Sequence, residues 1–584
     1  MRARWAGLLL IGWAAIGPTG AEAAERDGRP NVLLIITDDQ GHGDLGFHGN
    51  PKIRTPHLDR LARESVRLER FYVSPVCAPT RAALLTGRYN YRTGVVDTFL
   101  GRTLMRPEEV TLAEILAAAG YRAGIFGKWH LGDNFPMRPI DQGFHEALVL
   151  KGGGIGQASD PPGGESYFDP ILQKNGKPVR VKGYCSDVFT DAALDFITAN
   201  RDRPFFAYLA FNAPHTPLEV PDRDVAPYRA MDLGHDQFPR VGHPLPGPAL
   251  ADVTARVYGM VSNIDANLGR LLARLDELKL AEDTVVIFLT DNGPQQVRYN
   301  SGMLDRKGSV HEGGIRVPCF LRWPGHWSPK AIDRISAHID LTPTVLDLCG
   351  VSPPAAVRFD GRSLRPLLEA EPGLQWPDRA LFAQWHRGDV PEAYRAFAAR
   401  TQRYKLVRPE SAHVRGLPLD SSLELYDMES DPLEFRNIAA DRPEVVADLR
   451  ARYDAWFEDV GRARGYAPPR IELGSPRENP SILTRQDWRG PRAGAVGKPL
   501  GHWEVEIARS GTFVVRAHFD PPQSATTVSL SLRGVTLEKN PGPDASEITF
   551  GPVALTAGPG RLEVAVGKGD ASYGPRFVEV ERRE

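Results

Sequence analysis

Cysteine is scarce in this chain of 584 residues. There are four cysteines, which is few for an exported protein, and they are Cys77, Cys185, Cys319 and Cys349. At most two disulfides could be formed from them, too few to hold a chain of this length together. We therefore expect the fold to be stabilised by its apolar core and not by disulfide bonds.

Net charge is also nearly absent. The chain has 71 Lys and Arg against 73 Asp and Glu, which leaves a formal charge of −2 at pH 7. Without a basic excess, there is no reason to propose nucleic acid or an anionic membrane surface as a partner. No segment contains the ~18 unbroken apolar residues that a membrane-spanning helix requires. These features are typical of a globular protein that recognises its ligand at a local site.

Residues 1–24 have the composition of a secretory signal peptide. Arg2 and Arg4 make a basic start, residues 6–16 form an apolar run, and Ala21-Glu22-Ala23 is a small-x-small cleavage site. The run is too short for a membrane span, although an N-terminal membrane anchor is the alternative interpretation. We therefore expect a secreted or periplasmic protein with no membrane span after signal cleavage.

The length predicts two or three domains, because one ordinary core does not extend over so many residues. Three continuous apolar runs are typical of strands buried on both faces of a parallel sheet, at residues 31–37, 205–211 and 284–290. Helical patterns lie between these runs, at residues 111–119, 187–199 and 250–278. This alternation predicts an α/β domain over residues 25–372, with a largely parallel sheet flanked by helices.

The C-terminal third has a different pattern. Short apolar segments at residues 381–407 and 423–426 predict an antiparallel sheet, and residues 443–461 predict an amphipathic helix that covers it. A Pro-rich stretch follows, and then apolar residues alternate with polar ones between clusters of Gly, Pro and Asp, as in a small β-sandwich. The expected units are an antiparallel subdomain with its packing helix, a linker and a β-sandwich module, at residues 373–466, 467–480 and 481–584.

Acidic side chains follow two of the three apolar runs. Asp38 and Asp39 stand where the first run ends, and Asp291-Asn292 stands where the last run ends. The carboxyl ends of parallel strands meet at one edge of a sheet, where open α/β sheets bind ligands. Neighbouring residues of a strand point to opposite faces, so the two aspartates can share an ion only if the chain turns there, as Gly41 and Gly43 would allow. These oxygens suit Ca²⁺ or Mg²⁺, although either pair alone is more often an ordinary turn.

The segment Cys77-Ala78-Pro79-Thr80-Arg81 combines a thiol with the start of a helix. Pro79 suits the first helical turn, residues 82–85 are good helix formers, and Gly87 can end the helix. Cys77 is therefore expected at or just before a helix N-terminus, where N–H groups and the helix dipole favour an anion. Taken alone, such a cysteine is far more often a small buried residue that begins an ordinary helix.

This segment, with the Leu85-Thr86-Gly87 that follows it, resembles the signature of the formylglycine-dependent type I sulfatases, Cys-x-Pro-(Ser/Thr)-Arg and then Leu-Thr-Gly. The arylsulfatases belong to this family, and its fold is that of the alkaline phosphatase superfamily. The resemblance implies that a maturation enzyme oxidises Cys77 to formylglycine. Thr80 stands where many members have Ser, a variant that this maturation usually accepts. With Cys77 converted, the other cysteines allow at most one disulfide.

Three further clusters resemble the family's active site and occur in the family's order. They are Gly127-Lys128-Trp129-His130-Leu131-Gly132, Asn212-Ala213-Pro214-His215-Thr216-Pro217, and Lys307 ahead of Glu312-Gly313-Gly314. The resemblance implies as catalytic residues Cys77, Arg81, Lys128, His130, His215 and Lys307. It implies as metal ligands Asp38, Asp39, Cys77, Asp291 and Asn292. Calcium is the family's usual ion, and magnesium is the alternative.

The chemistry that the resemblance implies accounts for these residue types. A sulfate ester repels a nucleophile until positive charge neutralises its oxygens, and the metal, Arg81, Lys128 and Lys307 would supply that charge. In the family, one hydroxyl of the hydrated formylglycine attacks sulfur and expels the alcohol, and the second hydroxyl then expels sulfate. By resemblance, His130 assists that elimination, and His215 serves the leaving oxygen together with Lys307.

The expected substrate is a sulfated carbohydrate, with aryl sulfates as model substrates, because aromatic and basic groups at the pocket rim suit sulfated sugar rings. The candidate rim residues are Phe47, His48, Tyr89, Gly152 to Gly154, Trp385, His386 and Arg387. The residues expected to bind substrate are Lys128, His215, Lys307 and His386. The terminal module is expected either to bind carbohydrate or to serve as a structural cap.

Two other functions remain as alternatives. A phosphodiesterase or phosphonate hydrolase of the same superfamily can also use formylglycine and a metal. The segments Gly127–Gly132 and Glu312-Gly313-Gly314-Ile315-Arg316 favour a sulfatase over these enzymes. A non-catalytic relative that binds sulfated glycans is the second alternative, but no expected active-site position is lost in this sequence.

Overall fold

The structure is a computed structural model, and it describes residues 28–245, 247–370, 373–409, 423–462, 465–523, 527–542, 544–567 and 569–583. The predicted signal peptide at residues 1–24 lies outside the described residues.

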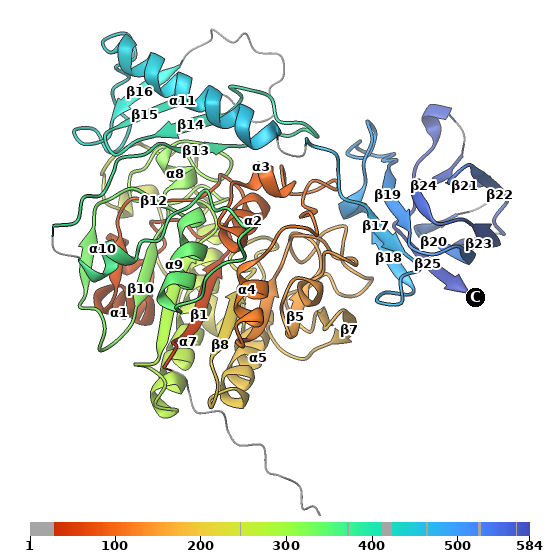
Figure 1. Ribbon diagram of the computed structural model, residues 1–584, viewed down its shortest axis with the longest axis horizontal. Helices are drawn as coiled ribbons and strands as arrows, with labels where there is room; N and C mark the ends of the chain where they lie inside the picture. Colours follow the sequence, from red (N-terminus) through yellow and green to blue (C-terminus); the bar gives the residue numbers. More distant parts are fainter. Residues whose placement is uncertain are drawn as a thin grey trace, which may run out of the picture.

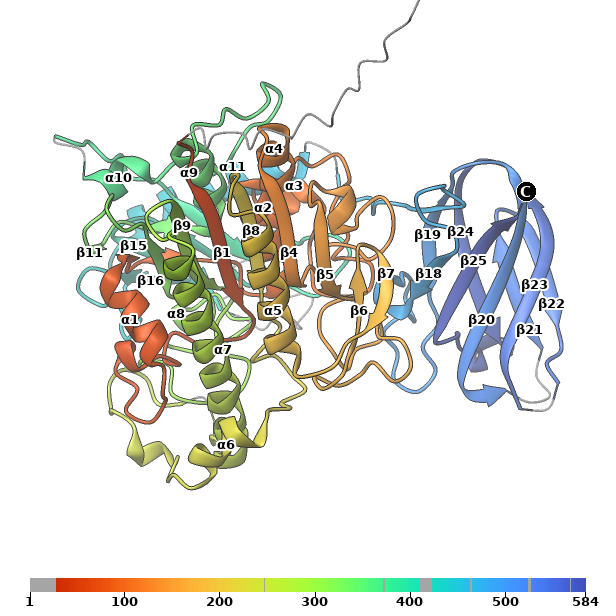
Figure 2. The same cartoon turned by 90° about the horizontal axis from the view of Figure 1, so that it is seen from below.

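A ten-stranded mixed sheet forms the centre of the larger part of the molecule (Figures 1 and 2). Its five middle strands, in the order β9-β1-β8-β4-β5, are all parallel, which confirms the predicted largely parallel sheet. Antiparallel pairings attach shorter strands at both edges. In spatial order the strands are β11 (Lys330–Ile332), β2 (Val66–Leu68), β10 (Cys319–Arg322), β9 (Thr284–Thr290), β1 (Asn31–Thr37), β8 (Phe205–Ala210), β4 (Arg122–Lys128), β5 (Glu146–Leu150), β6 (Ile171–Lys174) and β7 (Lys177–Arg180).

Helices cover both faces of this sheet, because its central strands are apolar on both sides. Leu33 and Ile35 of β1 pack into one core with α1 (Pro56–Glu64), α5 (Cys185–Ala199) and α7 (Ala251–Glu277). The alternate β1 residues pack on the other face, in a second core with α2 (Cys77–Thr86), α4 (Leu112–Ala118) and α9 (Leu341–Leu348). Thr111 and Glu114 form a capping box that fixes the start of α4. Shorter elements complete this part: β3 (Phe71–Tyr72), β12 (Ser336–Ala337), α3 (Asn90–Thr93), α6 (Asp222–Arg229), α8 (Glu312–Ile315) and α10 (Arg365–Glu369).

A smaller antiparallel sheet follows in the chain, as predicted. Its strands pair in chain order: β13 (Leu381–Gln384), β14 (Phe397–Arg400), β15 (Tyr404–Arg408) and β16 (Glu424–Asp427). Helix α11 (Pro443–Arg462) lies across this sheet (Figure 1) and buries Leu449, Tyr453 and Trp456 of its apolar stripe. Both the sheet and the helix therefore have the structure that their periodicity predicts.

The C-terminal region is a β-sandwich of two sheets, seen in blue in Figure 1. One sheet contains β17 (Ile471–Leu473), β19 (His502–Ile507), β24 (Gly558–Val566), β21 (Val528–Leu532) and β22 (Val535–Lys539). The other contains β18 (Ser481–Thr484), β25 (Phe577–Arg583), β20 (Gly511–Gln523) and β23 (Ala545–Leu555). Trp488 and Trp503 are fully buried in the apolar core of this region. The alternation in the sequence predicts this architecture correctly.

The stretch 467–480, which we predict to be a linker, differs from the prediction. It contains β17, which pairs in parallel with β19 through Ile471 opposite Val505. Ile471 and Leu473 are buried in the core of the sandwich. The sandwich therefore begins before residue 481, and much of the Pro-rich stretch belongs to it.

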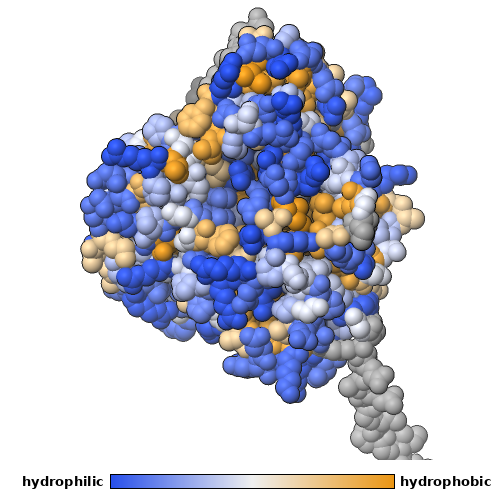
Figure 3. Space-filling view, turned by 90° about the vertical axis from the view of Figure 1, so that its left-hand side faces the viewer, coloured by the Kyte–Doolittle hydropathy of each residue, from blue (hydrophilic) through white to orange (hydrophobic). Residues whose placement is uncertain are grey.

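The surface and the cysteines agree with a fold held by its core. The face in Figure 3 is mostly hydrophilic, with apolar patches separated by polar side chains. Among the described residues, no helix is both long enough and apolar enough to cross a bilayer. All four cysteines are buried, and none of them forms a disulfide.

A buried ion cluster joins the antiparallel sheet to the larger part of the molecule. The Lys405 Nζ atom of β15 lies 2.8 Å from a Glu312 carboxylate oxygen of α8 and 2.8 Å from a Glu434 carboxylate oxygen. All three side chains are buried. Burial alone would raise the pKa of Glu434, but the Lys405 and His311 charges outweigh it and lower that pKa to about 2.

We expect Lys405→Met to lower the free energy of unfolding by about 3–5 kcal/mol, because it leaves two buried carboxylates without their cation. Urea denaturation followed by fluorescence would measure the loss. Lys539→Met, at an exposed position of β22, is the matched control and should change the value by less than about 0.5 kcal/mol. A Lys405→Met protein as stable as this control would contradict the role given to the cluster.

Candidate active site

The acidic side chains meet where β1 and β9 end. Thr37 and Thr290, the last residues of these parallel neighbours, lie opposite each other. The Asp39 N–H donates a hydrogen bond of 3.2 Å to the Asp291 carboxylate, which joins the two turns that follow the strands. These acidic side chains therefore lie close together in the structure, as the sequence predicts.

The turn after β1 is made by Asp39 and not by a glycine. Asp39 has φ 64°, in the left-handed region, whereas neither Gly41 nor Gly43 has a positive φ. Gly43 has another reason to lack a side chain, because a Cβ there would lie 2.5 Å from the Tyr299 carbonyl oxygen. The left-handed conformation of Asp39 turns the chain at this point. The turn places the Asp38 and Asp39 carboxylates at the same edge of the sheet.

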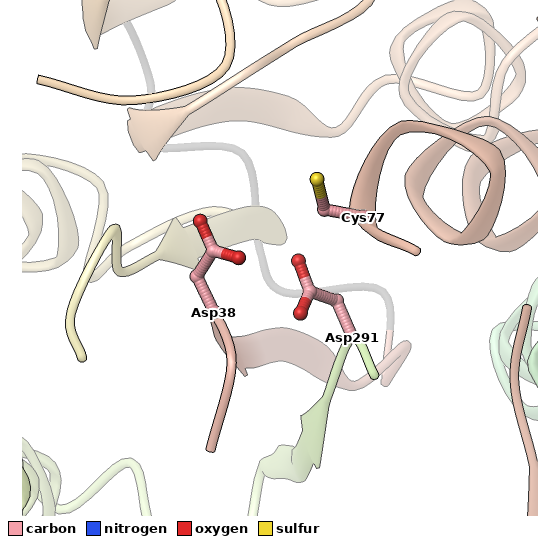
Figure 4. Close-up of side chains that lie close together, drawn as sticks. All are labelled: Asp38, Cys77 and Asp291. Carbon is pink, nitrogen blue, oxygen red and sulfur yellow. The ribbon is translucent and has the colours of Figure 1, made fainter. Parts of the chain in front are cut away.

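Cys77 is the first residue of α2, in agreement with the sequence prediction. The helix ends at Gly87, whose φ is 66° and whose N–H donates to the Ala83 carbonyl oxygen. Every residue of α2 is buried. Figure 4 shows the Cys77 side chain leaving this helix on the side where the Asp38 and Asp291 carboxylates lie. Burial raises the pKa of the Cys77 thiol above its ordinary value, so the unmodified side chain is a poor nucleophile at neutral pH.

Several oxygens at this centre have no hydrogen-bond donor in the part of the chain that the structure describes. They are Asp38 Oδ1, Asp39 Oδ2 and Asn292 Oδ1, and all three are buried. The Asn292 amide nitrogen donates to Asp39 at 2.8 Å and to the Gly293 carbonyl oxygen at 2.9 Å, which leaves its amide oxygen free to accept. Ligand atoms of Asp38, Cys77 and Asp291 also lie within 4.8 Å of one another. Unpartnered buried oxygens on carboxylate and amide groups fit a hard divalent cation.

Three cations neutralise the three carboxylates, namely the buried Arg81 and Lys128 and the half-buried Lys307. The Lys128 Nζ atom lies 2.5 Å from Asp38, and the Lys307 Nζ atom lies 2.5 Å from Asp39. Arg81 donates to the Asp291 carboxylate through Nε at 3.1 Å and through Nη2 at 2.8 Å. Its third contact is a 3.0 Å hydrogen bond to the Lys128 carbonyl oxygen. These cations reach the centre from β4, from the segment before α8 and from α2.

The carboxylates nevertheless crowd one another. Burial and then the charge of Asp38 raise the pKa of Asp291 to about 7, in spite of Arg81. Burial alone would raise the pKa of Asp38 as well, but Lys128 and the other cations hold it well below its usual range. Burial lowers the pKa of Lys307, and the Asp39 carboxylate outweighs that effect and raises it. The raised pKa of Asp291 indicates that the three cations do not fully compensate the negative charge of the carboxylates. The centre can therefore accept a further positive charge.

Two histidines border the centre. The Nε2 atom of His130 makes a 2.8 Å hydrogen bond with the Thr98 carbonyl oxygen, and its Nδ1 atom has no partner among the described residues. The Nδ1 atom of His215 lies 2.7 Å from the Thr216 carbonyl oxygen, and its Nε2 atom lies 3.8 Å from Asp39. Burial lowers the pKa of both imidazoles, most strongly that of His130, where Lys128 adds to the effect. His130 is therefore neutral at pH 7.

A cavity of about 550 Å³ opens above these groups. Four of the predicted site residues line it, namely Cys77, His130, His215 and Lys307. Trp385 and Arg387 line it as well, and the Arg387 guanidinium lies 4.5 Å from the centre of the Phe99 ring and 5.0 Å from that of Trp385. Its other lining residues are Val76, Thr98, Phe99, Gly153, Gln157, Ala158, Thr216, Gln295, Arg306, Gly308 and Gln486.

His386 is not among the residues that line this cavity. Its ring is buried, its Nε2 atom accepts a hydrogen bond from the Glu392 N–H at 2.7 Å, and its Nδ1 atom lies 3.2 Å from the Arg387 carbonyl oxygen. Of the other rim candidates, His48 stacks on His42 and Tyr89 packs against Trp456. Residues 385 and 386 follow the end of β13 at Gln384, and there the Trp385 side chain faces the cavity while the His386 ring contacts the loop that follows it.

Some residues that line the cavity have no signal in the sequence. Thr98, Phe99 and Arg306 belong to no motif, and Gln486 comes from the terminal β-sandwich. A local pattern cannot indicate them, because the fold brings them to the cavity from distant parts of the chain. Of these four residues, only Arg306 is adjacent to a residue that the sequence motifs indicate, because it directly precedes Lys307.

The chain matches a family model described as Sulfatase over residues 30–351, and one described as N-sulphoglucosamine sulphohydrolase, C-terminal, over residues 300–457. With the geometry above, this match shows that the chain belongs to the sulfatase family, the type I enzymes of the alkaline phosphatase superfamily. The protein is therefore an enzyme of the class that hydrolyses sulfate esters of sulfated sugars or aryl sulfates.

Individual relatives agree with this assignment. The chain is 34% identical to human arylsulfatase A over 509 residues, which is 78% of this chain and 92% of that protein. It is 34% identical to N-acetylgalactosamine-6-sulfatase of Canis lupus familiaris, over 66% of this chain and 73% of that protein. Among solved structures, Ps i-CgsB in complex with k-i-k-neocarrahexaose is 27% identical, with a TM-score of 0.62, over 75% of this chain and 95% of that chain.

Gly293 offers a test of the geometry at the centre. A Cβ at this position would lie 1.9 Å from the Gly313 carbonyl oxygen, where the turn after β9 packs against the segment that follows Lys307. We expect Gly293→Ala to separate these segments and to lower the rate of sulfate release by at least about 10²-fold, the usual effect of losing one preorganised group. Release of 4-nitrophenol from 4-nitrophenyl sulfate would measure the rate.

Gly247→Ala is the matched control, because a Cβ there would meet nothing within 4 Å. That variant should retain the parent rate. A Gly293→Ala enzyme with the same activity as the control would show that the close approach of the two segments is not needed.

Proposed function

We propose that this enzyme is a secreted or periplasmic sulfatase that acts on a sulfated carbohydrate, with a formylglycine made from Cys77 and a divalent cation at its centre. The observation that carries the proposal is the position of Cys77 at the floor of a cavity, within reach of buried carboxylates that have spare acceptor oxygens. We assign the cation to Asp38, Asp39, Asp291 and Asn292 with the modified residue 77, and we expect calcium, with magnesium as the alternative.

The proposed residues divide the chemistry among them. Lys128 and Lys307 hold the sulfate oxygens and neutralise their charge, which allows a nucleophile to approach sulfur. A bound divalent cation would add Lewis-acid polarisation at the same oxygens. Arg81 keeps residue 77 and Asp291 in place, since it donates to Asp291 from the helix that carries residue 77. The low dielectric of the buried centre strengthens each of these interactions.

Proton transfer is assigned to the two histidines. His215 lines the cavity and lies near Lys307, so we propose that the two residues stabilise the departing oxygen of the alcohol. His130 is a neutral imidazole whose Nδ1 atom has no partner in the described part of the chain, so we propose that it accepts a proton during the release of sulfate. We do not extend the substrate contacts to His386, because its ring nitrogens contact the backbone of the neighbouring loop.

A carbohydrate substrate is supported by the rim and by the relatives. Arg387 stacked between Phe99 and Trp385 offers aromatic faces and a cation to a sugar that carries acidic groups. A cavity of about 550 Å³ has the size of a site for one or two small rings. One relative is named for sulfated N-acetylgalactosamine, and one similar structure holds a neocarrahexaose.

We also propose how the enzyme is exported and matured. Residues 1–24 would be removed as a signal peptide, and a formylglycine-generating enzyme would act on Cys77 before α2 is buried in the fold. Residues 25–372 and 373–466 would then form the catalytic unit, followed by the terminal module. The buried position of Cys77 supports maturation before folding, because an enzyme cannot reach a fully buried thiol in the native state.

The competing reaction is hydrolysis of phosphate or phosphonate esters. A phosphonate monoester hydrolase of Agrobacterium radiobacter shares the fold, with 24% identity and a TM-score of 0.50, so the fold alone does not separate the two reactions. The sulfatase relatives at 34% identity favour sulfate. Release of phosphate faster than sulfate from matched 4-nitrophenyl esters would reverse this choice.

The first experiment is the mass of the tryptic peptide that contains residue 77, together with sulfate release, for protein made in a host that has the maturation enzyme. We expect the formylglycine mass, and we expect Cys77→Ser to lower turnover by more than about 10³-fold because it lacks the second hydroxyl. Cys349→Ala removes another buried thiol, at the C-terminal end of α9, and should keep its activity. A plain cysteine mass in an active enzyme would contradict the proposed nucleophile.

Metal binding can be tested apart from activity. We expect Asn292→Ala to raise the dissociation constant for Ca²⁺ by roughly tenfold or more, because it removes a buried acceptor oxygen from the set of ligands. Isothermal titration calorimetry with Ca²⁺ and with Mg²⁺ would measure both affinities. Asn540→Ala, at an exposed position of the terminal module, is the control and should bind as the parent does. Equal affinities in the two variants would remove Asn292 from the proposed site.

A further inference from the structure

The terminal β-sandwich reaches the active-site cavity. A single turn of 3-10 helix, η5 (Arg485–Asp487), follows β18, and its middle residue Gln486 lines the cavity that contains Cys77. Gln486 is only 5% exposed. The matched family models end at residue 457, so this residue lies outside the part of the chain that they cover.

Hydrogen bonds fix Gln486 against a segment of the cavity rim, residues 98–101. The Gly101 N–H donates to the Gln486 carbonyl oxygen at 2.9 Å, and the Gln486 side-chain amide donates to the Thr98 carbonyl oxygen at 3.1 Å. Gly101 has φ +65°, and a Cβ there would lie 2.7 Å from the Arg489 side chain. The rim and the sandwich therefore fit each other closely at this point.

The rest of the interface is also firmly joined. Leu104 and Met137 of the larger part of the molecule are buried in the apolar core of the sandwich. The Glu478 carboxylate accepts hydrogen bonds from the Phe135 N–H at 2.9 Å and from the Asn134 side chain at 3.2 Å. These contacts hold the sandwich as a fixed wall of the cavity, whereas a tethered carbohydrate-binding module would move relative to it.

The partners of the Gln486 amide determine its orientation. The Thr98 carbonyl oxygen can only accept, and it lies within hydrogen-bond distance of both His130 Nε2 and the Gln486 side chain. The nitrogen of the amide must therefore face Thr98. Its oxygen has no donor in the part of the chain that the structure describes, and it is available to a hydroxyl group of a bound molecule.

The charges of the cavity indicate what this oxygen would bind. Lys307, Arg306 and Arg387 are donors that suit the oxygens of a sulfate or another acidic group. An amide oxygen accepts hydrogen bonds and repels sulfate oxygens, so it suits a neutral donor such as a sugar hydroxyl. Gly152 lies beside it, and a Cβ on Gly152 would be 3.6 Å from the Gln486 Cδ atom. The side chains of Ser159 and His130 occupy the space next to Gly152 and Gly153, so the backbone there can approach no more closely than glycine allows.

We propose that the terminal β-sandwich is an integral wall of the active site, and that Gln486 is a specificity-determining residue that accepts a hydrogen bond from a hydroxyl of the sugar that carries the sulfate. This inference rests on the proposed function, because it concerns the leaving group of that reaction. It assigns to the sandwich a role that differs from both a separate carbohydrate-binding module and a structural cap.

The test compares two kinds of sulfate ester that differ in their hydroxyl groups. Sulfate release is measured with 4-nitrophenyl sulfate, which has none, with the 2-, 3-, 4- and 6-sulfates of galactose, and with the 3-, 4- and 6-sulfates of N-acetylgalactosamine. We expect Gln486→Leu to lower kcat/KM about tenfold on the best sugar sulfate, the usual effect of one lost hydrogen bond, and less than twofold on 4-nitrophenyl sulfate. Gln486→Asn, which keeps the amide but shortens its reach, should act in the same direction and serves if the leucine variant does not fold.

Arg489→Met is the matched control for a purely structural effect. Arg489 donates to the Leu100 carbonyl oxygen across the same interface, at 3.4 Å, but it does not line the cavity. Its replacement should therefore change both esters by the same factor. Equal losses on both esters for Gln486→Leu, or no loss on either, would overturn the inference.

The failure of the proposed function would look different. An enzyme with formylglycine at residue 77 that releases sulfate from neither kind of ester would reject that function, and the inference with it. A parent enzyme that cleaves 4-nitrophenyl sulfate but none of the sugar sulfates would leave the sulfatase assignment in place and overturn the sugar contact of Gln486.

Discussion

Neutralisation of three buried carboxylates is the constraint on which the active site depends. Each of them, Asp38, Asp39 and Asp291, has been removed from water and is paired with one cation. Loss of one partner from such a pair costs several kcal/mol, because the remaining charge is left buried alone. The cations come from β4, from α2 and from the segment before α8, so the centre is complete only when the sheet and both of these segments are in place. The geometry for chemistry is thus obtained together with the fold.

The active site can be compared with a structural ion cluster of the same protein, and the two differ in their access to a cavity. In the cluster of Glu312, Lys405 and Glu434, one cation lies between two carboxylates and helps to join two sheets. At the active site, acceptor oxygens remain without donors among the described residues although every carboxylate has a cation, and the site opens into a cavity. Buried polar atoms without partners are rare in folded proteins, and they usually indicate a ligand.

Local signals in the sequence predict much of this structure. The bounds of β1 and β9 agree with the apolar runs, and α4 begins at the Thr111–Glu114 capping box. Residue spacing also indicates which carboxylates meet, because the ends of parallel neighbours share an edge. The failures involve non-local structure. Strand β17 is three residues long in a Pro-rich stretch, and its strand character depends on pairing with β19, about thirty residues later. Which of Trp385 and His386 faces the cavity depends on the path of the chain after β13, which spacing does not determine.

The way in which residues 98–101 fit the sandwich has a consequence for how this architecture can be recombined. Tethered modules can be exchanged between enzymes because their linkers demand nothing of the partner. Here Gly101 must lack a side chain to admit Arg489, and Leu104 and Met137 must fill the core of the sandwich. A catalytic unit could therefore take over this sandwich only together with matching changes in its own rim. The two parts are expected to change together in evolution, as the halves of one domain do.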